Sequence, residues 1–158
     1  MDLQSQQVRI VGPKGGNIYQ AGANELNIMI GAKDTGGAFE LIEEVCQPGF
    51  MSRMHLHNDR SQTFYIVEGS ASVIVGEEHF DASQGSCVHV PPGVPHQIES
   101  EDGVKMIMVF SPGGMENLFS AVQDLSPEQA KDPEITSALT AAHDTIMVDD
   151  ESKGTVLG

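Results

Sequence analysis

Residues 49–69 read GFMSRMHLHNDRSQTFYIVEG, and no other stretch of the chain constrains the architecture as strongly. His55 and His57 are two positions apart, so on a β-strand both imidazoles project from one face and can reach a single metal ion. Residues 58–61 then form a turn that reverses the chain. The next strand begins at Gln62, whose side-chain oxygen can meet the same ion. We therefore predict two neighbouring strands that share a metal site.

A second stretch, residues 85–96, reads GSCVHVPPGVPH. It ends a strand in a rigid Pro/Gly turn and delivers a third imidazole, that of His96. The predicted ligands of one divalent metal ion are thus His55, His57, Gln62 and His96. Such a nitrogen-rich set suits Zn, Fe, Ni, Mn or Cu, with bonds of roughly 2.0–2.2 Å, and the sequence does not select among these metals. The alternative is that these are ordinary histidines, each paired with a neighbour or facing solvent.

The remaining chain predicts one domain of the all-β class with a short C-terminal helical appendage. Short apolar or alternating runs separated by Gly, Pro, Asn and Asp extend from Val8 to Phe110, a pattern typical of a sandwich or barrel. Helical spacing and helix-starting residues follow Pro112. The predicted organisation is 1–33 N-terminal strands, 34–111 barrel core with both metal motifs, 112–148 C-terminal helices and 149–158 flexible tail.

Charge and composition exclude several classes of partner. The chain has 8 Lys and Arg against 23 Asp and Glu, a formal net charge of -15, which repels nucleic acids and anionic membranes. No signal peptide and no segment long enough to span a bilayer is recognisable, so we expect a cytoplasmic protein. Cys46 and Cys87 lack the spacing of a zinc knuckle or redox pair and are expected to be reduced thiols.

The two histidine-bearing stretches resemble the paired motifs of the cupin superfamily. The first motif is matched by Gly49, His55, His57, position 62 and Gly69; the second is matched by Gly85, Pro91, Gly93 and His96, with Ser100 where Asn is usual. More narrowly, the chain is similar to small single-domain bacterial cupins described as quercetin-dioxygenase-like. The resemblance implies a jelly-roll β-barrel, also called a double-stranded β-helix, and a homodimer.

The family usually has Glu where this chain has Gln62. Glutamine neither cancels part of the metal charge nor accepts a proton, so the ligand set is entirely neutral and the ion a stronger Lewis acid. We therefore expect a metal-dependent cyclase, isomerase, dehydratase or lyase ahead of a dioxygenase, and similar small cupins include polyketide cyclases. Glu43 is the candidate general base, and its alternative role is to tie down a neighbouring strand. The competing hypotheses are a quercetinase-like dioxygenase and a non-catalytic cupin that binds a small molecule.

Strand parity predicts an apolar cavity beside the metal, suited to a hydrophobic, oxygenated small molecule such as an enol, a phenol or a polyketide. The residues expected to line it are Met51, Met54, Phe64, Ile66, Ile98, Met106, Met108 and Phe110. The alternative for each of them is plain core filling.

Overall fold

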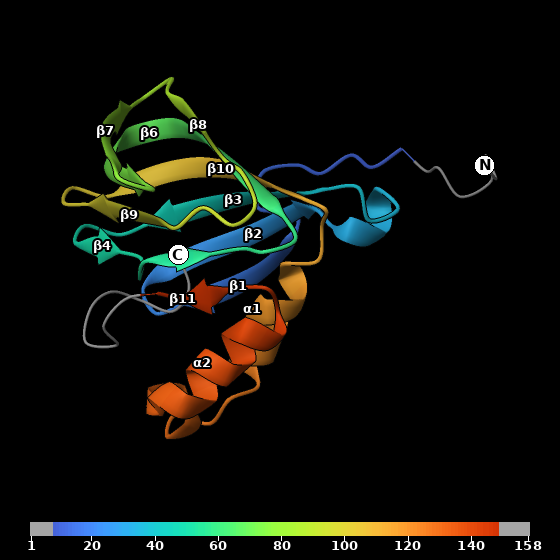
Figure 1. Cartoon of the computed structure of the whole chain (residues 1–158). Helices are drawn as coiled ribbons and strands as arrows, with labels where there is room; N and C mark the ends of the chain where they lie inside the picture. The colour runs from blue at the N-terminus through green and yellow to red at the C-terminus, as the bar shows by residue number, and fades with distance from the viewer. Residues whose placement is uncertain (1–7, 149–158) are drawn as a thin grey trace.

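The computed structural model describes residues 8–148 and shows a mostly antiparallel β-structure of the jelly-roll type, with two short helices (Figure 1). Its strands are β1 (Asn17–Ala21), β2 (Asn24–Ile30), β3 (Glu40–Cys46), β4 (Phe50–Met51), β5 (His55–Leu56), β6 (Ser61–Val75), β7 (Glu78–Ser83), β8 (Cys87–Val90), β9 (His96–Ser100), β10 (Val104–Ser111) and β11 (Ile146–Met147). The helices are α1 (Glu116–Gln123) and α2 (Pro133–Ala142), with 3-10 turns at Ala32–Asp34 and Gln129–Lys131.

The strands form two layers joined by the long strand β6. Its first half pairs with β10 and β8, and the layer continues through β3 and β2 to β1. Its second half pairs with β7 and β9, and β9 pairs in turn with β4 and β5. Gly69 lies between the two halves with φ of 79°, and a Cβ there would lie 2.5 Å from the carbonyl oxygen of Gly103. Only glycine fits where β6 passes from one layer to the other.

The space between the layers is filled by apolar side chains. Six of these side chains are at most 1% exposed, namely those of Phe64, Ile66, Val73, Ile98, Met106 and Met108. They come from β6, β9 and β10, whose alternating residues point inward. The barrel interior is therefore packed rather than open.

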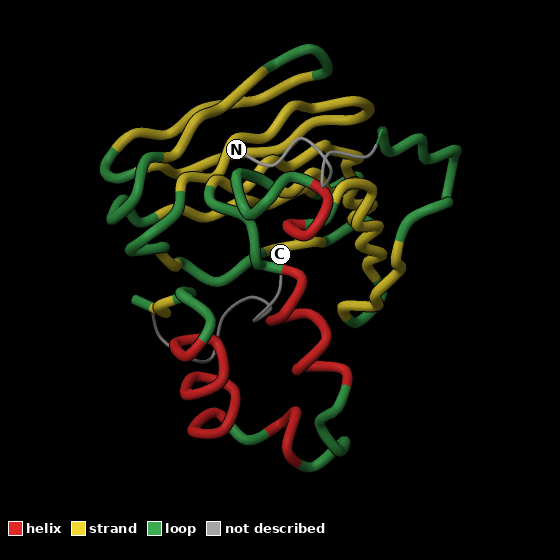
Figure 2. Tube along the Cα trace, turned by 90° about the vertical axis from the view of Figure 1, so that its right-hand side faces the viewer, coloured by secondary structure: helices red, strands yellow, loops and turns green. Residues whose placement is uncertain are grey.

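The C-terminal helices lie together beside the strands (Figure 2). Helix α1 packs against β1, where the rings of Tyr19 and Phe119 are 6.3 Å apart. Its start is fixed by Glu40, a buried residue of β3 whose carboxylate accepts a hydrogen bond of 2.7 Å from the Met115 backbone N–H. Asp132 caps α2 by accepting from the N–H groups of Glu134 and Ile135. In the part of the chain that the structure describes, no helix is long and apolar enough to cross a membrane.

The predicted all-β class and the helical appendage are confirmed, but several local expectations are wrong. Residues 8–11 are not a strand and leave Val8 and Ile10 about 90% exposed. The hairpin strand β7 and the short strand β11 were not predicted, since neither has strong apolar alternation. Residues 126–128, Ser-Pro-Glu, are typical of a helix start, but the structure forms only the 3-10 turn at Gln129–Lys131 there. The predicted flexible tail, 149–158, lies outside the described residues.

Candidate metal centre

Two neighbouring strands, β5 and β9, bring the predicted histidines together. His55 begins β5 and lies directly opposite His96, the first residue of β9, while His57 follows immediately after β5. Each residue offers one ring nitrogen, and the three nitrogens all lie within 4.8 Å of one another. The side chains are buried, with exposures of 6% for His55, 3% for His57 and 0% for His96. The three imidazoles can therefore hold one metal ion.

Backbone carbonyl groups orient all three rings. His55 Nδ1 lies 2.7 Å from the carbonyl oxygen of Arg53, and His96 Nδ1 lies 3.1 Å from that of Val94. His57 Nδ1 lies 2.7 Å from the carbonyl oxygen of Asp144. Because a carbonyl only accepts, each Nδ1 carries the proton and each neutral ring presents an unprotonated Nε2. This is the usual way in which metal-binding histidines are fixed in orientation and tautomer.

Gln62, at the start of β6, directs its amide oxygen toward the same point. Its Oε1 lies 2.9 Å from His96 Nε2 and 3.3 Å from His57 Nε2, while its amide nitrogen donates to the sulfur of Met108 at 3.3 Å. Because the Nδ1 atoms of His57 and His96 carry the ring protons, the Nε2 atoms of these two rings have no proton to donate to the Gln62 oxygen. Facing lone pairs in a buried site are stabilised by a cation between them, so the residues present fit a divalent metal ion.

Burial keeps the imidazoles neutral. Loss of hydration is the largest cause that lowers the pKa of all three histidines, and for His55 the neighbouring His96 and His57 lower it further. The pKa of His96 falls to about 4. The neutral form, which is the form that binds metals, is thus favoured at neutral pH.

A cavity of about 20 Å³ adjoins the histidines, room for about one water molecule. Its wall is formed by Leu26, His55, His57, Gln62, Met108, Phe110, Met115, Leu118, Phe119 and Thr145. Of the residues predicted to bind substrate, Met108 and Phe110 lie in this wall. The wall residues that were not predicted are Leu26, Thr145 and three side chains from α1 and its start, Met115, Leu118 and Phe119. Leu118 and Phe119 do lie in the segment after Pro112 that was predicted to be helical.

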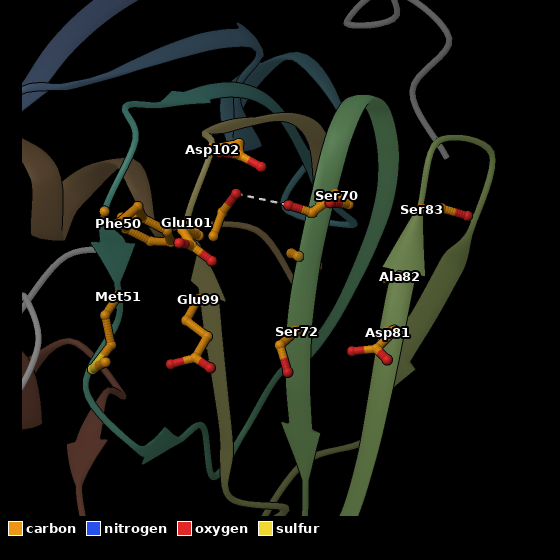
Figure 3. A pocket seen from close by; sticks show the side chains of 13 residues that line it. Phe50, Met51, Ser70, Ser72, Asp81, Ala82, Ser83, Glu99, Glu101 and Asp102 are labelled. Carbon is orange, nitrogen blue, oxygen red and sulfur yellow. Dashed lines mark hydrogen bonds between the residues drawn. The ribbon is translucent and has the colours of Figure 1, made fainter.

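The other residues predicted to bind substrate lie elsewhere. Phe64, Ile66, Ile98 and Met106 fill the interior between the layers and do not reach this cavity. Met54 is also absent from its wall. Met51 instead lines a groove of about 500 Å³ formed by residues of β4, β6, β7 and β9 and the loops beside them (Figure 3). That groove carries carboxylates and hydroxyl groups and contains none of the three histidines.

The expected position of Glu43 is wrong. Residues 40, 42, 44 and 46 of β3 point inward, so Glu43 projects from the outer face, where its Oε2 lies 3.3 Å from Lys105 Nζ on β10. It ties two neighbouring strands together and does not approach the histidines. The inward carboxylates are Glu40 and Glu44. Glu44 is fully buried beside the Cys46 thiol, and no nitrogen or oxygen donor among the described residues hydrogen-bonds to either of its oxygens.

Comparison with known proteins agrees with this architecture. Residues 42–110 match the family described as "Cupin domain". A crystal structure of an RmlC-like cupin from Shewanella frigidimarina superimposes with a TM-score of 0.62, at 22% identity, over 72% of this chain and 98% of that one. An uncharacterized protein of Methanocaldococcus jannaschii is 29% identical over 80 residues, 51% of this chain and 60% of that protein.

Similarity also extends to quercetin 2,3-dioxygenase of Bacillus subtilis, at 26% identity over 98 residues, which are 61% of this chain and 29% of the enzyme. The chain therefore spans less than two thirds of either sequence relative. The match to the family, the jelly-roll topology and the placement of both histidine motifs at one buried point agree with one another. Residues 42–110 are a cupin domain, and the described chain has the jelly-roll fold of cupins.

Proposed function

We propose that this protein is a metal-dependent enzyme that acts on a small, apolar, oxygenated compound, of the enol, phenol or polyketide kind, by Lewis-acid chemistry. One observation carries the proposal. Four neutral acceptor atoms, three imidazole nitrogens and the amide oxygen of Gln62, converge at one buried point beside a mostly apolar cavity. A ligand set without negative charge leaves the full charge of a cation to act on a substrate oxygen.

His55, His57, His96 and Gln62 would hold the ion. When bound there, a divalent metal supplies stabilisation of the negative charge that develops on a substrate carbonyl or enol oxygen. The set suits Zn, Fe, Ni, Mn or Cu. Gln62 keeps its amide N–H on the sulfur of Met108, so its oxygen stays directed toward the imidazoles.

No carboxylate is available as a base in the described cavity wall. Glu40 is engaged by the Met115 backbone N–H, and Glu43 lies outside the barrel. Glu44 lies farther along β3 than Glu40. Glu40 pairs with Phe110, which lines the cavity, whereas Glu44 pairs with Met106, which does not. Thr145 contributes the one hydroxyl group of this wall, and it can donate a hydrogen bond to a substrate oxygen. This arrangement favours cyclisation, isomerisation, dehydration or elimination over a reaction that begins with proton transfer to a carboxylate.

The cavity wall also favours an uncharged ligand. Its side chains are mostly apolar, and no Lys or Arg is among those described as lining it. A phosphorylated or carboxylated compound would lose its hydration there without a cationic side chain in return. Because the cavity holds about 20 Å³, an organic ligand enters only when part of the wall moves.

The second candidate is a quercetinase-like dioxygenase, favoured by the sequence similarity to the B. subtilis enzyme. The test begins with metal analysis of the purified protein, followed by incubation of metal-loaded and metal-free protein with a panel of neutral enols and phenols. Metal-dependent products that are isomers of the substrate, or have lost water, support Lewis-acid chemistry. Oxygen consumption with incorporation of two oxygen atoms supports the dioxygenase. Binding without turnover across the panel would indicate a non-catalytic cupin, and absence of bound metal would refute the proposal.

A further inference from the structure

The three histidines differ in where their orienting carbonyl groups come from. His55 and His96 each use the residue two positions earlier in their own segment, Arg53 and Val94. His57 uses Asp144, which follows α2 and is 87 residues away in the chain. The orientation of one imidazole out of three therefore depends on a distant C-terminal segment.

Asp144 is fixed on the turn that follows His57. Its carboxylate accepts hydrogen bonds from the backbone N–H of Asn58 at 2.7 Å and of Asp59 at 3.1 Å, and it pairs with Arg60 Nε at 3.1 Å. The Arg60 and Asp144 side chains are only 13% and 10% exposed. The φ of Asp144 is 59°, a left-handed conformation that aspartate tolerates better than most residues. Asp144 thus has two roles: its carboxylate binds the turn after His57, and its backbone carbonyl binds the His57 ring.

The residues after Asp144 continue along the strand that bears the ligands. Ile146 pairs with Leu56 and Met147 with His55, and the Val148 N–H donates to the carbonyl of Met54 at 3.0 Å. Thr145, 3% exposed, lies in the cavity wall beside His57. We call residues 144–148 the strap. It covers the free edge of β5 and closes one side of the candidate metal centre.

We propose that the strap positions His57 as a metal ligand, so that docking of the strap and binding of the metal strengthen each other. With the strap undocked, His57 Nδ1 loses its acceptor, and the ring is free to adopt the other tautomer and other rotamers. With the strap docked, Nε2 is held toward Gln62 and His96. This coupling is reciprocal: if docking of the strap raises the metal affinity by a given factor, bound metal raises the equilibrium constant for docking by the same factor. This inference rests on the metal centre of the proposed function.

The test compares Zn²⁺ binding to metal-free full-length chains by calorimetric titration. Asp144→Gly keeps a residue that accepts positive φ and retains the carbonyl, but removes the carboxylate that fixes the strap to the turn. We expect its dissociation constant for Zn²⁺ to rise about 10- to 100-fold, as for loss of other groups that orient metal ligands. The control is Asp132→Ala, which removes the N-terminal cap of α2 and leaves every strap contact in place. Its Zn²⁺ affinity should stay that of the native chain.

A second measurement uses the native chain alone and does not depend on the folding of a variant. Zn²⁺ should slow hydrogen exchange of the Val148 amide, which is protected only while the strap is docked. Native-like Zn²⁺ affinity in Asp144→Gly, or Val148 exchange that ignores bound Zn²⁺, would overturn the strap inference and leave the proposed function standing. A native chain that binds no Zn²⁺ or other divalent metal would instead refute the proposed function, and this inference with it.

Discussion

The amide oxygen of Gln62 lies 2.9 Å from Nε2 of His96, although neither atom carries a proton when the ring is neutral. The close approach of two acceptors is the clearest mark of a cation site in this barrel. It also makes position 62 the place where one substitution changes the charge of the ligand set and little else.

Gln62→Glu should tighten divalent metal binding and weaken the Lewis acidity of the bound ion, because the carboxylate neutralises one unit of its charge. We expect slower Lewis-acid turnover and, with a flavonol, a gain in oxygen uptake, since glutamate can accept the substrate proton. An oxygen electrode and metal titration measure both effects. Gln84→Glu, in an exposed turn, adds the same charge away from the site and serves as the control. Rapid oxygen uptake by the native chain, slowed in Gln62→Glu, would contradict the preference for non-oxidative chemistry.

His96→Ala should abolish stoichiometric metal retention, because it removes a fully buried ligand that faces both His55 and Gln62. The loss should exceed the roughly 10- to 100-fold effect of removing a group that only orients a ligand. His89→Ala is the matched control: His89 is exposed on β8 and bonds to Thr63. Metal analysis after purification and dialysis reads out both variants. Equal metal content in the two would mean that the ion binds somewhere else.

The convergence of the candidate ligands could be predicted from sequence because it depends on local rules. A spacing of two on a strand puts His55 and His57 near one another, and the Pro/Gly turn before His96 fixes where its strand begins. The inward face of β3 could not be predicted in the same way. One face carries Ile42 and Cys46 and the other Leu41 and Val45, so apolar alternation does not distinguish them. Packing between β2 and β10 decides, and it buries Glu44 instead of Glu43.

The partner of His57 was unpredictable for a different reason. Nothing local to Asp144 points to residue 57, because the contact is a backbone carbonyl placed by the path of the chain after α2. The cavity wall depends on a similar long-range arrangement, with α1 held in place by Glu40 of β3. Sequence patterns locate side chains within an element, whereas these contacts depend on how elements meet.

Glu44→Gln should remove a pH dependence of stability. Burial raises the pKa of Glu44 from 4.5 to about 7. The folded state therefore holds this proton more tightly than the unfolded state, so the stability it contributes is complete below pH 4.5 and is lost as pH rises through about 7. The loss amounts to about 3 kcal/mol by pH 8, so the variant should be more stable than the native chain at pH 8 and similar to it near pH 4.5. Urea unfolding across this range measures the difference.

Glu43→Gln is the control for that experiment, since it makes the same substitution one residue away on the outer face. Its partly exposed ion pair with Lys105 should contribute no more than about 1 kcal/mol. If Glu43→Gln and Glu44→Gln gave parallel curves, the carboxyl of Glu44 would not be titrating in the buried position that the structure gives it.

Leu118→Ala should enlarge the cavity beside the histidines and destabilise the protein. Leu118 is 1% exposed and lines the cavity from α1, so its truncation should cost about 3 kcal/mol.

The new apolar space lies next to the candidate metal site, and a small neutral aromatic such as phenol should occupy it. Phenol should then raise the melting temperature of Leu118→Ala more than that of the native chain, because binding to the folded state alone stabilises it. Asn117→Ala, at the exposed neighbouring position, controls for the change of helix composition. A destabilised Leu118→Ala that gains nothing from phenol would show that the wall collapses around the lost side chain, and the proposed apolar ligand would then need another way to the metal.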